Sequence, residues 1–285
     1  MDQASTLILA LALIIIMLGM GLSLTAEDFK RVFLYPKAIL IGLLNQLILL
    51  PLIAFGITSV FDLRPEIAIG LMILAACPGG ATSNLIAHLA KADTALSVSL
   101  TALSSFITLL TIPFIVNFAL GHFLDEGQLI QLDIPATIAQ ILVIVIIPVI
   151  LGMLVRRYRK GFAQQMAKPV RIASGLVLAL VIIGLIIKEK NNVLGYAQQA
   201  GLVALLLNIG TMAMGYLTAR FFKMNLKQTR TISIESGIQN GTLAITVAIA
   251  LLGNAEYAIA PAIYSLIMFG SGALVIWLGN KQSRI

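Results

Sequence analysis

Oxygen-bearing side chains lie inside long apolar stretches of this sequence, where polar groups are costly. Glu235 is the only Asp or Glu well within such a stretch. An ionised carboxylate at that depth needs a partner, because leaving it uncompensated costs several kcal/mol or more. No Lys or Arg lies at comparable depth in another stretch, so the partner would be a bound cation or a proton. A protonated, hydrogen-bonded structural glutamate is the alternative.

Neutral oxygens accompany this carboxylate. Ser97, Thr101, Ser104 and Thr108 are spaced by four, three and four residues, which places them on one face of a helix. Gln46 is an amide inside another apolar stretch. Hard cations prefer oxygen ligands, and a single negative charge favours a monovalent ion over Ca²⁺. Ligand chemistry alone leaves Na⁺ and H⁺ coupling both open.

Two apolar stretches are interrupted near their middles by similar segments. Residues 77–84 read CPGGATSN and residues 235–242 read ESGIQNGT. Pro removes a backbone donor and Gly weakens a helix, so both segments predict a broken helix. The free N–H groups at the start of a half-helix attract anions, and the exposed carbonyls of a break suit cations. Two kinks that merely shape packing are the alternative.

The elements that carry these residues are membrane helices. Of the 285 residues, 59% are apolar and 11% are charged, whereas soluble domains carry about a quarter charged residues. Mean hydropathy is +1.01. Apolar runs of about 20 residues suffice to span the hydrocarbon core as a helix. The sequence therefore predicts an all-α polytopic membrane protein, without the short alternating segments of a β-barrel.

We predict nine spans, and we expect the first to be a retained helix rather than a cleaved signal peptide. Pro113 and Pro148 fall inside two of them. The spans are expected at about residues 4–24, 37–58, 66–91, 93–120, 135–155, 170–187, 199–220, 228–252 and 256–279.

The distribution of Lys and Arg predicts the orientation. With the N-terminus outside and the C-terminus in the cytoplasm, 16 of the 19 basic residues face the cytoplasm. The net charge of +7 is then a topology signal, and no nucleic-acid partner is expected. We expect a multi-pass protein of the cell inner (plasma) membrane.

The two breaks are five spans apart, so they cross the membrane in opposite directions. Spans one to four pair with spans six to nine, and the fifth has no counterpart. This pattern is typical of an inverted repeat with discontinuous helices meeting near the midplane. We assign residues 1–134 to a first repeat of four helices and residues 135–285 to a second repeat of five.

The motifs at both breaks, together with Met20-Gly21, resemble the bile acid:sodium symporter family over nearly the whole chain. The resemblance implies a core domain of residues 37–120 and 199–279, which carries the crossed broken helices. A panel domain of residues 1–36 and 135–187 would move against it. Some bacterial members have ten helices, and this chain is expected to lack the counterpart of span five.

The resemblance also implies two sodium sites, which selects sodium over a proton. The first comprises Ser83, Asn84, Ser97, Thr101 and Glu235. The second comprises Gln46, Glu235 and Gln239 with the backbone carbonyls of Ser236 and Ile238. No cofactor is expected beyond Na⁺ as the coupling ion.

An organic anion is expected beside the crossing, at Ala81, Thr82, Asn240 and Gly241, with Met268 and Phe269 bordering its cavity. The last two replace a polar pair expected in some bacterial relatives. Family substrates range from bile acids to small carboxylates such as pantoate and pyruvate, and the sequence does not select among them. Neither His88 nor His122 lies in a cluster of metal ligands, and both are interpreted as structural or interfacial.

The predicted function is sodium-coupled symport of an organic anion by alternating access. A proton-coupled carrier or an efflux transporter of the same fold is the alternative. An intramembrane hydrolase is disfavoured, because an aspartyl type needs two membrane carboxylates and a Cys77–His88 dyad would be separated by about 16 Å of helix. The expected partners are sodium, the anion and membrane lipid, and no obligate protein partner is evident.

Overall fold

The computed structural model describes residues 3–124, 133–188 and 193–282, and these residues are helical apart from short connections. One isolated antiparallel bridge, between Gly79 and Gln239, joins two of the connections. The helices are α1 (Gln3–Gly21), α2 (Ala26–Lys30), α3 (Pro36–Leu44), α4 (Leu50–Val60), α5 (Pro65–Ala76), α6 (Ala81–Leu89), α7 (Thr94–Phe123), α8 (Ile134–Ile141), α9 (Ile147–Tyr158), α10 (Lys160–Lys188), α11 (Val193–Phe221), α12 (Leu226–Gly237), α13 (Gly241–Thr246) and α14 (Ile259–Gln282). Short 3₁₀ turns occupy Arg31–Phe33 and Glu256–Ala258.

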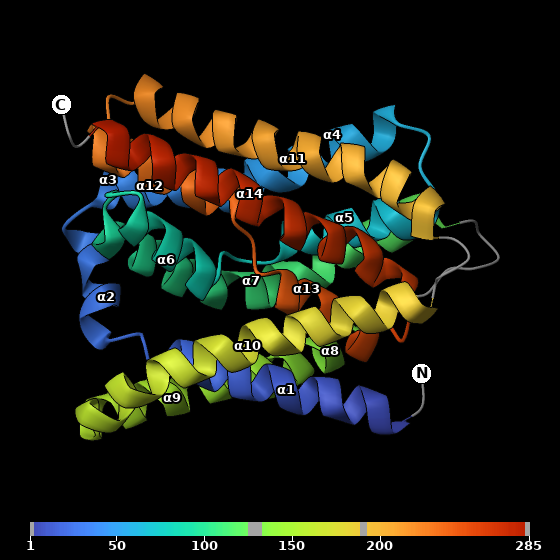
Figure 1. The fold of residues 1–285 in the computed structure, drawn as a ribbon, viewed down its shortest axis with the longest axis horizontal. Coiled ribbons are helices and arrows are strands. Elements are labelled where there is room, and N and C mark those ends of the chain that lie inside the picture. Colours follow the sequence, from blue (N-terminus) through green and yellow to red (C-terminus); the bar gives the residue numbers. More distant parts are fainter. Residues whose placement is uncertain (1–2, 125–132, 189–192, 283–285) are drawn as a thin grey trace.

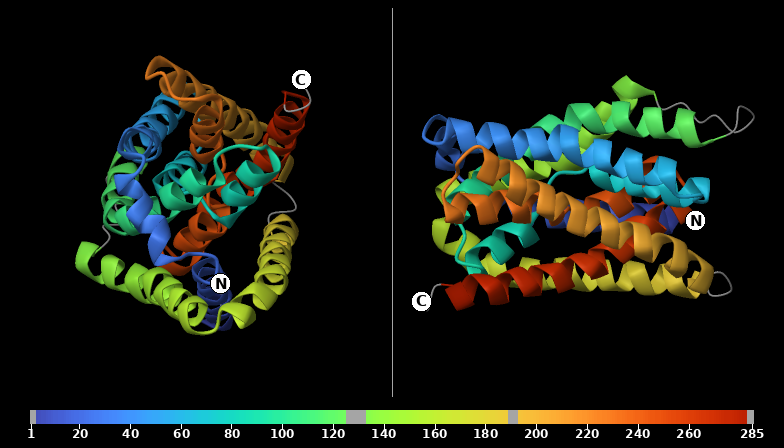
Figure 2. Two further views of the ribbon diagram at one scale, coloured as in Figure 1. Left: turned by 90° about the vertical axis from the view of Figure 1, so that its left-hand side faces the viewer. Right: turned by 90° about the horizontal axis from the view of Figure 1, so that it is seen from above.

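The helices form two groups that lie side by side. Helices α1, α9 and α10 pack on one another along one side of the molecule (Figure 1, Figure 2). Helices α5, α7, α11, α12 and α14 pack together in the other group, in which every residue of α5 from Ile67 to Ala76 is buried. A helix that is apolar on all sides belongs in a core, and α5 has that composition.

Both predicted interruptions coincide with helix ends. Cys77, which follows α5, is extended, as expected for a residue before a proline. Ile238 is extended after α12, and Asn240 caps α13 by accepting a hydrogen bond from the N–H of Leu243 at 3.0 Å. The two connections cross, and the N–H of Asn240 donates to the carbonyl of Pro78 at 2.9 Å. Backbone groups freed by one break are thus paired by the other.

Two prolines are preceded by wide π-helical turns that keep the helix axis continuous. The turn η2 (Asn45–Leu49) joins α3 to α4 before Pro51, and the turn η4 (Leu142–Ile146) joins α8 to α9 before Pro148. A proline cannot donate to the carbonyl four residues earlier, and a wider turn accommodates that loss. A third such turn, η5 (Val247–Leu251), follows α13.

Length and apolar composition identify some of the predicted spans. Among the described residues, four helical segments are long and apolar enough to cross a membrane: Pro36–Val60, Ile134–Tyr158, Gln198–Phe221 and Glu256–Lys281. Helix α7, bent between Thr108 and Leu110, would be a fifth. The halves of a broken helix fail this criterion individually, because 12 residues of α5 extend only about 18 Å. The count of nine spans therefore stays a prediction.

The helix predicted over residues 170–187 begins ten residues earlier, at Lys160. Hydropathy marks where a chain enters the apolar layer, whereas a helix continues until its backbone hydrogen bonds are interrupted. The basic segment after α9 therefore forms the first turns of α10 rather than a loop.

Close backbone contact holds α1 against α9. A Cβ atom added at Gly152 would overlap the carbonyl oxygen of Leu18 and lie 2.8 Å from the Cα of Gly21. Small residues are typical where membrane helices approach this closely, because packing rather than the hydrophobic effect drives helix association in lipid.

We expect Gly152→Ala to lower the free energy of unfolding by about 1–3 kcal/mol, because the opposing atoms are backbone and cannot rotate away. Thermal unfolding of the purified protein in detergent measures the change. The matched control is Gly161→Ala in α10, where an added Cβ has no atom within 4 Å. Equal unfolding temperatures for the two variants would contradict the close contact.

Candidate functional site: a carboxylate among hydroxyls beside an amphipathic cavity

The carboxylate of Glu235 lies at the centre of the crossing and is 3% exposed. It projects from the last turn of α12, where it meets the start of α7. The Ser97 hydroxyl donates to its Oε1 at 2.5 Å, and the Thr101 hydroxyl donates to its Oε2 at 2.9 Å. Two of the four hydroxyls predicted to share one face of this helix therefore bond to the carboxylate. Ser104 and Thr108 bond instead to carbonyls of their own helix.

The first predicted sodium set converges around this carboxylate. Asn84 Oδ1, on α6, lies 2.8 Å from the Ser97 hydroxyl and 3.2 Å from the Thr101 hydroxyl. Ser83 Oγ lies 3.4 Å from Thr101 Oγ1 and donates to the carbonyl of Gly80 at 2.8 Å. All five predicted residues therefore lie in one cluster.

The cluster holds more acceptors than hydrogens. Ser97 and Thr101 carry one hydroxyl hydrogen each. Three acceptor oxygens, two from Glu235 and one from Asn84, lie within hydrogen-bond distance of these two hydroxyls. A cation placed among the oxygens would remove this imbalance, because it needs acceptors alone.

Gly79 is required for the close approach of backbone and carboxylate. A Cβ at this position would lie 2.7 Å from Glu235 Oε2 and 3.3 Å from Ser83 Oγ. Any side chain at residue 79 would therefore displace the carboxylate or fill the space between the oxygens. The glycine of the CPGG motif has a steric role here in addition to breaking the helix.

The second predicted sodium set meets on the other side of the crossing. The Gln46 amide, held in the π-turn η2, donates to Gln239 Oε1 at 2.7 Å and to the carbonyl of Cys77 at 3.3 Å. The Gln239 amide donates to the carbonyls of Glu235 and Ser236, at 3.3 and 2.9 Å.

The Gln46 amide has a second orientation that also satisfies it. Turned by 180°, its nitrogen donates to the Glu235 carbonyl at 2.7 Å and its oxygen accepts from the N–H of Gly79 at 3.1 Å, provided that the Gln239 amide, 2.7 Å away, turns as well and donates to it. Ile238 contributes its backbone to the same break, where its N–H donates to the carbonyl of Ile234 at 2.8 Å. Several carbonyl oxygens therefore compete for two amide groups, again an excess of acceptors.

A support behind the break was not predicted from the sequence. The carbonyl of Gly237 accepts hydrogen bonds from Asn208 Nδ2 and from the Tyr264 hydroxyl, each at 2.8 Å. Both side chains are fully buried. Asn208, with Thr211 one turn later, is a polar interruption of the apolar span 199–220, and that signal could have identified it.

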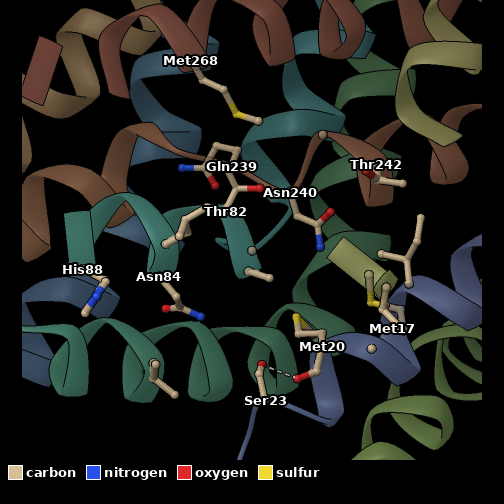
Figure 3. A pocket seen from close by; sticks show the side chains of 18 of the residues that line it. Met17, Met20, Ser23, Thr82, Asn84, His88, Gln239, Asn240, Thr242 and Met268 are labelled. Carbon is tan, nitrogen blue, oxygen red and sulfur yellow. Dashed lines mark hydrogen bonds between the residues drawn. The ribbon is translucent and has the colours of Figure 1, made fainter. Parts of the chain in front are cut away.

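A cavity of about 520 Å³ lies beside the crossing, between α1 and α10 on one side and α6, α13 and α14 on the other (Figure 3). All six residues predicted to border the anion line it. Its described lining consists of Ile16, Met17, Gly19, Met20, Ser23, Gly80, Ala81, Thr82, Asn84, Leu85, His88, Thr94, Val98, Val170, Gln239, Asn240, Gly241, Thr242, Met268 and Phe269.

The two histidines have different environments. His122 packs among the rings of Phe55, Phe118 and Phe123, as expected for a structural residue. His88 instead lies on the wall of the cavity, on the same helix as Thr82 and Asn84 (Figure 3). His88 is seven residues, or about two helical turns, from Ala81, so both lie on the face of α6 that lines the cavity. This spacing could have identified His88 from the sequence, although it lies in no cluster of metal ligands.

The arrangement is suited to binding a monovalent cation. Among the described residues, no group of three His, Cys, Asp or Glu side chains converges. The available ligands are one carboxylate and several neutral hydroxyl, amide and carbonyl oxygens. This set of ligands suits a hard ion of low charge.

We expect Ser97→Ala to lower the free energy of unfolding by about 1–3 kcal/mol, because it removes a short bond to a buried carboxylate. The control is Ser99→Ala, whose hydroxyl bonds to the carbonyl of Ala95 on its own helix. Thermal unfolding in sodium-free buffer compares them. A wild-type unfolding temperature in Ser97→Ala would contradict the bond to Glu235.

Comparison with known proteins places these features in a family. The chain is 31% identical over 269 residues to the probable sodium/metabolite cotransporter BASS1, chloroplastic, of Arabidopsis thaliana, covering 93% of this chain and 65% of that protein. It is 31% identical over 270 residues to the uncharacterized sodium-dependent transporter YocS of Bacillus subtilis (strain 168), covering 92% and 80%. It is 27% identical over 246 residues to the human ileal sodium/bile acid cotransporter, covering 85% and 69%. These relatives are named as transporters, not enzymes. Residues 10–196 match the profile described as the Sodium Bile acid symporter family, and the chain therefore belongs to that family.

Proposed function

We propose that this protein is a secondary transporter that couples sodium ions to the symport of an organic anion. The observation that carries the proposal is the buried cluster around Glu235, in which three acceptors compete for two hydroxyl hydrogens. The names of the relatives, which include sodium/metabolite and sodium/bile acid cotransporters, support sodium as the ion.

Two sodium ions are assigned to the two sides of the crossing. The first binds the side-chain oxygens of Ser83, Asn84, Ser97, Thr101 and Glu235. The second binds Gln46, Glu235 and Gln239 with the carbonyls of Ser236 and Ile238. Glu235 belongs to both, through its carboxylate in the first site and its backbone carbonyl in the second, and neutral oxygens complete the shell of each ion.

The anion is assigned to the cavity, with its carboxylate near the start of α6. Gly80 has no side chain to cap α6, so the N–H groups of Ala81 and Thr82, in the first turn of that helix, can donate to a carboxylate. Asn240 and Gly241 face this end, and Met268 and Phe269 supply apolar surface. A bile acid or a small carboxylate, such as pantoate or a 2-keto acid, fits this description.

Transport requires the cavity to open alternately to each side. In the proposed architecture of nine spans and an inverted repeat, α1, α9 and α10 belong to a panel and the crossed helices belong to a core. The cavity lies between these two groups, which supports a movement of one against the other. It extends along α6 toward Lys91 and the start of α7, the end assigned to the cytoplasm, so this conformation is interpreted as facing inward.

The order of events follows from electrostatics. Sodium ions bind first from outside, compensate Glu235 and order both breaks, and the anion follows. Each unit charge that crosses with the membrane potential gains about 2.3 kcal/mol per 100 mV.

The orientation in the membrane is proposed from the positions of the two outermost helix ends. The first residues of α1 and the last residues of α14 lie at opposite ends of the bundle (Figure 1). This arrangement is compatible with an external N-terminus and a cytoplasmic C-terminus in the plasma membrane.

Sodium should stabilise the wild-type protein against heat, because a ligand that binds only the folded state adds RT ln(1 + [L]/Kd) to its stability. Glu235→Ala should lose this effect, whereas Glu256→Gln, which alters an acidic residue paired with Arg64 away from the crossing, should retain it. The measurement is thermal unfolding in NaCl against matched KCl. Identical curves in the two salts would disprove sodium binding and favour a proton-coupled carrier with Glu235 as the proton site.

Transport should be electrogenic, because two sodium ions with one monovalent anion move one net charge inward. Proteoliposomes with an inward sodium gradient are tested with radiolabelled taurocholate, pantoate and pyruvate. For an accepted anion, an inside-negative potassium diffusion potential should accelerate uptake. An uptake rate that does not change with the membrane potential would refute the two-sodium stoichiometry, but it would not contradict sodium coupling.

A further inference from the structure

His88 is distinctive among the described residues that line the cavity. It is the only one of them whose side chain belongs to the Asp, Glu, His, Lys and Arg group, and it is exposed to the cavity space. The imidazole carries at least one N–H donor in either protonation state. A transported molecule in the cavity can therefore meet a hydrogen-bond donor that the sodium sites do not use.

The position of His88 on α6 sets its distance from the other polar end of the cavity. Ala81 begins the helix, and His88 follows seven residues later, near its C-terminal end. At 1.5 Å per residue this separation is about 10 Å. Thr94, at the start of α7, lines the cavity as well.

The lining around these two ends is mixed. On α6, Asn84 and Leu85 lie between Ala81 and His88 along the chain, and both line the cavity. Met17 and Met20 line it from α1, and Met268 lines it from α14 (Figure 3). The cavity thus has a polar end at the start of α6, apolar side chains from α1 and α14, and a second polar group at His88.

We propose that His88 determines substrate specificity by binding a second acceptor group about 10 Å from the carboxylate of the transported anion. The substrate class is an elongated anion with a carboxylate at one end, an apolar portion that contacts α1 and α14, and a hydroxyl or second carboxylate at the other end. This inference rests on the proposed function, because it assumes that the first carboxylate binds at Ala81 and Thr82.

Two nine-carbon probes test it: azelate, which has a carboxylate at each end, and nonanoate, which has only one. Their dissociation constants are measured with protein in lipid nanodiscs containing saturating NaCl. The ratio of the two constants removes effects of chain length and of general membrane partition. Wild-type protein should bind azelate more tightly than its His88→Ala variant does, while nonanoate should bind both similarly.

The preference for azelate over nonanoate should fall about tenfold in His88→Ala, the effect expected for loss of one hydrogen bond to a charged group. His88→Gln keeps an N–H donor and should retain part of the preference. The control is Leu89→Ala, which alters the neighbouring residue of α6, outside the cavity lining. This variant should retain the full preference for azelate.

The outcomes separate this inference from the proposed function. A preference for azelate that is unchanged in His88→Ala, or a wild-type protein that binds neither probe or both equally, overturns the assignment of His88. Thermal stabilisation by sodium, recorded on the same samples, is independent of the probes. Its absence would overturn the proposed function instead.

Discussion

The crossing of two interrupted helices is the constraint on which the rest of this structure depends. Pro and Gly free backbone groups in the middle of an apolar protein, where an unpaired polar group is costly. The structure pairs them with each other: Asn240 donates its N–H to the carbonyl of Pro78, and Gly79 lies opposite Gln239. This contact brings Glu235 against the backbone of residue 79, so the same interaction that satisfies the breaks also assembles the oxygen cluster.

The ion cluster and the cavity share residues, which provides a physical route for coupling. Asn84 lies within hydrogen-bond distance of the hydroxyls around Glu235, and it also lines the cavity. Gln239 pairs with Gln46 on one side of the crossing and faces the cavity on the other. A cation that reorients either amide changes the surface that an anion meets. Coupling between two ligands requires such a differential interaction, and it is reciprocal by thermodynamic necessity.

The crossing is held from behind as well as across its centre. Asn208 and Tyr264 fix the Gly237 carbonyl from α11 and α14, while the π-turn η2 presents Gln46 from the opposite side. In a low-dielectric interior, an unpaired carbonyl is costly, so these bonds determine which carbonyls of the break stay fixed and which can serve a ligand. Those of Glu235 and Ser236 bond to the Gln239 side chain rather than to a neighbouring helix.

The sequence by itself determined the helical membrane class, the positions of both breaks and the residue types of the cluster. Each of these is local: apolar run length, Pro and Gly in sequence, and hydroxyls at helical spacing act on neighbouring residues. Only the tertiary structure decided that Ser97 and Thr101, but not Ser104 and Thr108, reach Glu235, since that depends on where α7 crosses α12. It also decided that His88 faces a cavity whereas His122 packs among aromatic rings. A one-dimensional pattern cannot distinguish these cases, because the distance between residues far apart in the chain is set by packing of all the helices between them.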